Sequence, residues 1–267
     1  MDTITCLWVQ DKLDEISIMC INSWLKLGYK VDLYTYSKDF KNEWANTQYC
    51  DQIFIKDASE IYDNQYDIKR LEFVADIFRF NLFKLNKVNR GSLDTSRTIL
   101  WCDTDQYLIR KIPEVGNFVS SQLTLATGAF KHKYIRQIPN IGVMCFDGWE
   151  NVDWKEILDK GLSCNTTEFQ SGFLKHYEKI IIKYDYACEA SLFCPIHWAW
   201  AKDIYCKSEI DINKSKYGLT PIEFQECIDN KKIIGLHLWR QLYKKSKWKI
   251  TEDSIYNKLK KLSSIKY

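Results

Sequence analysis

The stretch Thr98–Ile109, with the sequence TILWCDTDQYLI, constrains the fold of this chain more than any other. Three apolar residues, Ile99 to Trp101, are followed by Cys102 and then by Asp103 and Asp105. An apolar run of this length is typical of a buried strand, and two ionised carboxylates cannot follow it into an apolar core without partners. We therefore predict a central strand that ends at a polar site requiring a cation.

The spacing of the two carboxylates predicts a metal site. Residues two apart on a strand point the same way, so Asp103 and Asp105 could bind one hard divalent ion, with Thr104 turned aside. Such an ion keeps open positions that phosphate oxygens fill well. With 35 acidic residues in the chain, an Asp pair that merely forms a turn after a strand is the alternative. Its place at the end of an apolar run favours the metal site.

The first forty residues predict a strand, a helix and a second strand. Residues 4–9 (ITCLWV) read as a buried strand, residues 14–27 as a helix ended by Gly28, and residues 30–36 as an alternating strand. Parallel strands joined in this way place a ligand crevice at their carboxyl ends. Trp8, near the end of the first strand, is either a core residue or an aromatic face for a nucleobase.

Further elements follow in an alternating order. Asp76 and Arg79 share one face of a strongly periodic helix, either as a surface ion pair or as residues that reach a ligand. Asn140 opens a strand, where it is either a turn residue or faces the crevice. The expected segments are strands at 52–55, 118–127 and 141–146, and helices at 68–85, 153–162, 166–182 and 251–265.

A late apolar run, residues 233–239, delivers His237. A single histidine in such a run is more often a core residue than a ligand. The carboxylate pair needs a third ligand, however, and this raises the weight of the metal-binding alternative for His237.

Composition limits the kind of protein. With 267 residues, 46% of them hydrophobic, the chain can form one compact unit. A net charge of +3 and the lack of any base-reading motif argue against a nucleic-acid partner. Ten cysteines occur without a signal peptide or zinc spacing. We expect reduced core cysteines at Cys6, Cys20, Cys50, Cys102 and Cys145.

The two ends of the chain bear on location. The N-terminus lacks a basic and apolar leader, and no apolar run reaches a membrane-spanning length. We expect a cytoplasmic protein, soluble or peripheral on a membrane surface. Beyond Trp239 the chain is basic, and its last helix either docks on an anionic membrane or packs on its own domain.

Taken together, these stretches resemble the glycosyltransferases with a DXD-containing sugar-binding region. This family includes bacterial capsule and lipopolysaccharide transferases, fungal mannosyltransferases and, more distantly, the large glucosylating toxins. The resemblance rests on the order of five motifs along nearly the whole chain: Leu7-Trp8-Val9, Ala75-Asp76-Ile77-Phe78-Arg79-Phe80, Leu100–Asp105, Asn140-Ile141-Gly142-Val143 and His237-Leu238-Trp239.

The resemblance implies a fold and a domain organisation. The fold is α/β, a Rossmann-like single domain of GT-A type whose mixed central sheet is flanked by helices. Residues 1–240 would form the glycosyltransferase domain, with a nucleotide-sugar-binding half up to about 115 and an acceptor-side half from 116 to 240. Residues 241–267 would form a basic, helical C-terminal tail.

The resemblance also implies an activity and a metal. The chain would move a hexose or related sugar from a nucleoside diphosphate sugar, expected to be a UDP-sugar, to a hydroxyl of a glycan or glycoconjugate, with retention of configuration. The metal would be Mn²⁺ or Mg²⁺, bound by Asp103, Asp105 and His237, and the imidazole ligand favours Mn²⁺.

Roles for individual residues come from the same resemblance. Asp103, Asp105 and Arg79 would be catalytic. The donor would be bound by Trp8, stacking on the base, by Asp76, Arg79 and Asp103 on sugar hydroxyls, and by Asn140. Two alternatives stay open: a metal-dependent nucleotidyl or phosphoryl transferase shares the Asp pair, and a non-catalytic sugar-binding module would keep the aromatic residues.

Overall fold

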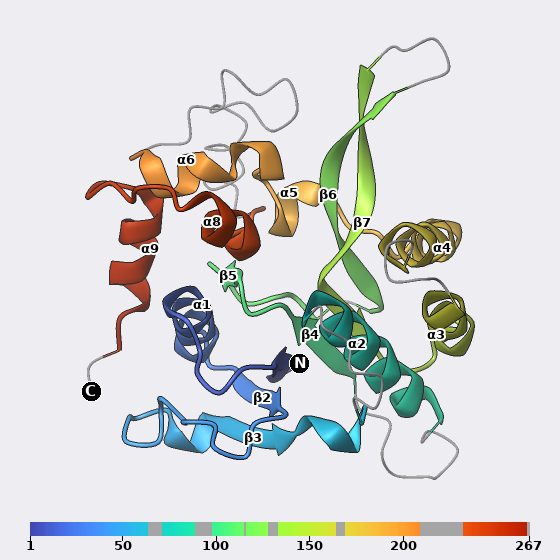
Figure 1. Ribbon diagram of the computed structural model, residues 1–267, viewed down its shortest axis with the longest axis horizontal. Helices are drawn as coiled ribbons and strands as arrows, with labels where there is room; N and C mark the ends of the chain where they lie inside the picture. The colour runs from blue at the N-terminus through green and yellow to red at the C-terminus, as the bar shows by residue number, and fades with distance from the viewer. Residues whose placement is uncertain are drawn as a thin grey trace.

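The computed structural model describes residues 1–63, 71–88, 98–114, 116–127, 133–163, 169–208 and 232–265. A six-stranded sheet in the order β3-β2-β1-β4-β7-β6 forms its centre, with helices on both faces (Figure 1). This confirms the predicted α/β class with a mixed central sheet. The strands are β1 Thr3–Trp8, β2 Lys30–Thr35, β3 Ile53–Asp57, β4 Ile99–Cys102, β6 Phe118–Thr127 and β7 Lys133–Phe146.

Strand direction changes at β4. Strands β3, β2, β1 and β4 run parallel, whereas β7 is antiparallel to both β4 and β6. The carboxyl ends of the four parallel strands therefore meet at one edge, the edge where ligands bind in open α/β sheets. Beyond β4, β5 (Gln106–Leu108) pairs antiparallel with β8 (Gly235–His237) in a small second sheet.

Alternation along the strands divides the core into two layers. Cys6 and Cys102 point to the layer that contains α1, whereas Leu7 and Trp101 point to the layer that contains α2, as the two-residue period of a strand requires. Figure 1 shows α1 and α9 on one side of the sheet, and α2, α3 and α4 on the other. The helices are α1 Glu15–Lys26, α2 Leu71–Val88, α3 Trp154–Ser163, α4 Phe169–Lys183, α5 Ala190–Phe193, α6 Ala201–Cys206, α8 Arg240–Ser246 and α9 Ile255–Ser263.

Some sequence expectations need correction. Asn140 lies inside β7, which begins at Lys133 because its pairing with β6 extends far beyond residue 141. Cys50 is exposed, while the other four cysteines expected in the core are buried. Residues 68–70 and 166–168, expected at the starts of two helices, lie outside the described residues.

The C-terminal helix packs on its own domain. Tyr256, Leu259 and Ile265 belong to the core layer that contains α1, and Tyr256 donates a hydrogen bond to Glu15 at the start of α1. Tyr256 and Leu259 of α9 are thus covered by the chain itself, whereas Leu262 is exposed; this packing agrees with the alternative in which the helix packs on its own domain. In the described part of the chain, no helix combines the length and apolar character needed to cross a membrane.

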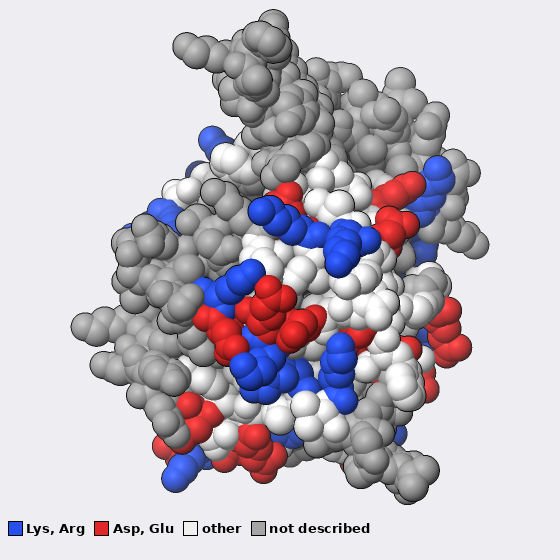
Figure 2. All heavy atoms as spheres, turned by 90° about the vertical axis from the view of Figure 1, so that its right-hand side faces the viewer, with Lys and Arg blue, Asp and Glu red and all other residues white. Residues whose placement is uncertain are grey.

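Charges of both signs intermingle on the face that carries α3 and α4. Figure 2 shows this face, which lies on the right of Figure 1. Typical pairs are Lys155 with Asp159 and Lys160 with Glu156, each four residues apart on α3. On the described residues of this face, charges of both signs are interspersed and form no basic stripe of the kind that binds nucleic acid.

Gly28 ends α1 with φ +82°, in the left-handed region. Because side chains at Gly28 would meet only Lys111 atoms at 3.9 Å, a substitution there should cost conformational energy alone. We predict that Gly28→Ala lowers the free energy of unfolding by about 1–2 kcal/mol in urea denaturation. As a control, Gly116→Ala places Cβ in open space and should change it by less than about 0.5 kcal/mol. Equal effects of the two variants would contradict this account.

Candidate functional site

A cavity of about 610 Å³ lies at the carboxyl ends of β1 and β4. Four segments far apart in the sequence line it: residues 7–10, one face of α2, residues 101 and 103–105, and residues between 237 and 244. Its volume is in the range of small-molecule sites. Six of the seven predicted site residues line this cavity, namely Trp8, Asp76, Arg79, Asp103, Asp105 and His237.

Arg79 joins two carboxylates at one side of the cavity. Its guanidinium lies 3.3 Å from Asp76 Oδ1 and 2.5 Å from Asp103 Oδ1, and only 2% of its side chain is exposed. Trp101 donates from Nε1 to the same Asp103 oxygen over 2.8 Å, and its ring lies 4.7 Å from Arg79 Cζ. The surface ion pair considered for Asp76 and Arg79 is therefore wrong, because both residues are buried.

Burial dominates the protonation equilibrium of Asp103. It raises the pKa of this carboxyl above the ordinary value, although the charge of Arg79 acts in the opposite direction. A buried carboxylate beside a guanidinium keeps its charge only through that partner. Arg79 is therefore needed to keep Asp103 available as an anionic group in the cavity.

Asp105 and His237 form a second pair across the cavity. Asp105 Oδ1 lies 3.3 Å from His237 Nε2, and Asp105 Oδ2 accepts from the backbone N–H of Arg240 over 3.1 Å. The register of β5 against β8, which places Gln106 opposite His237, brings the two residues together. Burial would raise the pKa of Asp105, but the charges of His237 and Arg240 hold it well below its ordinary value. Burial would lower the pKa of His237, and Asp105 raises it well above.

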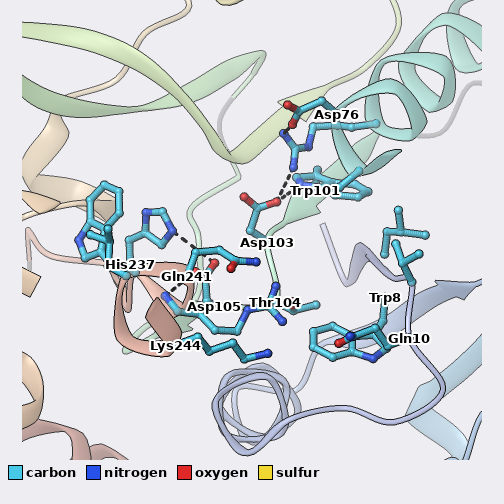
Figure 3. A pocket seen from close by; sticks show the side chains of 17 residues that line it. Trp8, Gln10, Asp76, Trp101, Asp103, Thr104, Asp105, His237, Gln241 and Lys244 are labelled. Carbon is cyan, nitrogen blue, oxygen red and sulfur yellow. Dashed lines mark hydrogen bonds and ion pairs between the residues drawn. The ribbon is translucent and has the colours of Figure 1, made fainter. Parts of the chain in front are cut away.

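The two aspartates occupy a turn, which corrects the prediction that both lie on a strand with Thr104 turned aside. β4 ends at Cys102, and the backbone N–H of Gln106 donates to the Asp103 carbonyl over 2.9 Å. Thr104 itself lines the cavity. In Figure 3, Asp103 points toward Trp101 and Asp76, while Asp105 lies near His237 and Gln241.

The donor atoms fit a metal ion in part. Asp105 Oδ1 and His237 Nε2 are 3.3 Å apart, a separation that two ligands at about 2.1 Å from one ion can span. Asp103 carries its hydrogen bonds from Arg79 and Trp101 on Oδ1, so Oδ2 is the oxygen left for an ion. Among the described residues, no three His, Cys, Asp or Glu side chains already cluster as a metal site. The three-residue metal site stays a prediction.

Asn140 is the predicted site residue that the structure places outside the cavity lining. Its Oδ1 accepts from Gly142 N–H over 2.7 Å, and its Nδ2 donates to Gln122. Gly142 in turn accepts from the backbone N–H of Asp103 through its carbonyl, at 2.7 Å. Asn140 thus orders the strand beside Asp103.

Basic side chains from α8 line the wall that the sequence left unassigned. Arg240 Cζ lies 4.6 Å from the centre of the Trp8 ring, and Lys244 Nζ lies 5.9 Å from it. Trp8 itself is buried and donates from Nε1 to the Lys12 carbonyl. The spacing of Arg240 and Lys244, four residues apart after Trp239, was the available signal, because on a helix it puts both on one face.

Comparisons with known proteins concern the fold. No protein-family model and no curated protein matches this sequence. The similar solved structures include the bifunctional glycosyltransferase WbbM, 12% identical, with a TM-score of 0.49 over 96% of this chain and 48% of WbbM. GlyE from Streptococcus pneumoniae is 12% identical, with a TM-score of 0.42 over 71% of this chain and 45% of GlyE. The galactosyltransferase LgtC, with donor and acceptor sugar analogues, is 10% identical, with a TM-score of 0.37 over 70% of this chain and 72% of LgtC.

The chain spans about half the length of WbbM and of GlyE.

Arg79→Met tests the buried pairing. It leaves the buried carboxylate of Asp76 and the partly buried carboxylate of Asp103 without their guanidinium, so we predict that the free energy of unfolding falls by roughly 3 kcal/mol in urea denaturation. The control is Lys155→Met, which removes one partner of an exposed ion pair on α3 and should leave the unfolding curve unchanged. A loss below about 1 kcal/mol for Arg79→Met would mean that the charges are hydrated and the pairing is weak.

Proposed function

We propose that this protein is a metal-dependent glycosyltransferase. It moves a hexose or related sugar from a nucleoside diphosphate sugar, with a UDP-sugar as the expected donor, to a hydroxyl of a glycan or glycoconjugate. One observation carries the proposal: residues of four of the five motifs, more than 200 residues apart at the extremes, line a single cavity. An unrelated Asp-x-Asp turn gives no reason for this convergence.

The charge of the cavity suits the hard step of glycosyl transfer. A diphosphate must leave while positive charge develops on the anomeric carbon, so cations placed beside the leaving oxygens lower the barrier. Arg240 and Lys244 stand on one wall, and Arg79 stands on another. We assign Arg240 and Lys244 to the diphosphate, and Asp76 and Arg79 to sugar hydroxyls.

Asp103, Asp105 and His237 are the residues that would hold the divalent ion of this proposal. When bound, it would supply Lewis-acid stabilisation of the leaving diphosphate. The imidazole of His237 favours Mn²⁺ over Mg²⁺. Cys194 Sγ lies 3.9 Å from His237 Nδ1, and Nε2 faces Asp105, an orientation that would suit a metal ligand.

Retention of configuration is proposed to proceed by attack on the same face as departure. A double displacement needs a carboxylate nucleophile beneath the sugar ring. The cavity carboxylates Asp76, Asp103 and Asp105 are already bound to Arg79 or His237. The leaving diphosphate would then accept the proton of the acceptor hydroxyl.

Asp105→Asn tests the catalytic assignment. Asp105 is a better position for this substitution than Asp103, because Asp103 is also the ion-pair partner of the buried Arg79 and its loss could unfold the protein. We predict that UDP release from UDP-sugars falls by at least about 100-fold, while circular dichroism and Tm show a folded protein. The matched control, Asp159→Asn on exposed α3, should keep full activity. Release of UMP or pyrophosphate by the unchanged protein would favour a nucleotidyl or phosphoryl transferase instead.

Metal removal tests the cofactor. We predict that EDTA abolishes UDP release and that Mn²⁺ restores it better than Mg²⁺. Calorimetric Mn²⁺ affinity should fall by about 10- to 100-fold in His237→Ala. The control is His176→Ala. His176 lies outside the cavity lining, with its Nε2 3.2 Å from Glu156 Oε1, and its substitution should leave the Mn²⁺ affinity unchanged. Full activity in EDTA would refute metal dependence.

A further inference from the structure

One carboxylate, that of Asp14, forms ion pairs with both Arg240 and Lys244 of α8. Asp14 Oδ2 lies 3.3 Å from Arg240 NH1 and 2.7 Å from Lys244 Nζ. The other oxygen of Asp14, Oδ1, accepts from Ser17 N–H over 2.9 Å and so caps the start of α1. Burial would raise the pKa of Asp14, but Lys244 and Arg240 lower it below the ordinary value. Asp14 thus binds the two groups assigned to the diphosphate.

The guanidinium of Arg240 does not make all the hydrogen bonds that it could donate. Its guanidinium donates to Asp14 over a long 3.3 Å, and its buried Nε has no acceptor among the residues that the structure describes. A phosphate group can accept two parallel hydrogen bonds from one guanidinium. A diphosphate would therefore be a better partner for Arg240 than Asp14 is.

Arg240 also covers the surface assigned to the base. Its guanidinium lies 4.6 Å from the centre of the Trp8 ring, and Trp8 is only 3% exposed. Figure 3 shows Lys244 extending along the same wall toward Trp8. A nucleobase can stack on Trp8 only after Arg240 has moved away.

The side chains of both cations can move without a shift of the helix that carries them. The start of α8 is fixed by the hydrogen bond from Arg240 N–H to Asp105, and Tyr243 stacks on the buried Tyr205 with 4.4 Å between ring centres. The side chains of Arg240 and Lys244 are 18% and 42% exposed. Rotation of these two side chains away from Asp14 therefore leaves the backbone of α8 in place.

We propose that Asp14 is an internal competitor of the donor. Without donor, the Asp14 carboxylate holds Arg240 and Lys244, and Arg240 covers Trp8. The diphosphate replaces the Asp14 carboxylate as their acceptor, and the movement of Arg240 exposes the Trp8 ring to the base. The inference rests on the proposed function for the identity of the anion. Asp14 touches no substrate and acts as a positioning residue.

Asp14→Asn isolates the charge, because asparagine caps a helix as well as aspartate does. Isothermal titration with pyrophosphate and with UDP should show affinity higher by about 5- to 30-fold, as expected for the loss of two partly exposed ion pairs. With a UDP-sugar, KM should fall and kcat should not rise. Asp153→Asn is the matched control, because Asp153 caps α3 through Glu156 N–H, also at 2.9 Å, and its affinities should equal those of the unchanged protein.

The outcomes separate this inference from the proposed function. Equal or weaker anion binding by Asp14→Asn would overturn the inference, since Asp14 would then preorganise the cations. A gain of the same size when Arg240→Met and Lys244→Met are both added would also overturn it, because no cation would then be left for Asp14 to hold. Tighter pyrophosphate binding by Asp14→Asn in a protein that releases UDP from no UDP-sugar would support the inference while the proposed function fails. UDP turnover with equal affinities would leave the function standing and refute the competition.

Discussion

The guanidinium of Arg79 is the group on which the cavity depends. Asp76 comes from α2 and Asp103 from the turn after β4, and only a buried cation between them lets both carboxylates stay ionised. The three groups together carry one net negative charge. A site built in this way attracts a cation on its open side, and the Trp101 ring packs against Arg79 on the other side.

The late part of the chain completes the site through strand pairing. β8 pairs with β5, and this register sets His237 beside Asp105, 132 positions earlier in the sequence. The backbone N–H of Arg240 then donates to Asp105, which fixes the start of α8 against the turn. Since the contact joins such distant segments, the full cavity can exist only after the whole domain has folded.

Local sequence patterns predicted the helices and strands, whereas contacts between distant residues determine the turn at 103–105 and the burial of the Asp76–Arg79 pair. The apolar period located β1, α1, β2 and β4, because alternation and helical spacing follow from burial of one face. The turn at residues 103–105 was not predictable, since it is held by contacts such as that of Trp24 Nε1 with the Gln106 carbonyl. The i,i+3 spacing of Asp76 and Arg79 is the same for an exposed pair and a buried one. Only tertiary packing separates these cases.

Trp8 is the core residue that one of its two sequence interpretations expected, while its role as a stacking surface for a base stays a prediction. Sequence reasoning set a core tryptophan against a stacking platform, and the structure gives a buried ring whose cover is the side chain of Arg240. Every charged group of the cavity wall already has a partner within the chain: Arg79 with Asp103, His237 with Asp105, and Lys244 with Asp14. Ligand binding here is therefore an exchange of partners. Its free energy is the difference between two sets of ion pairs, so single charge-neutralising substitutions around Asp14 can change the affinity in either direction.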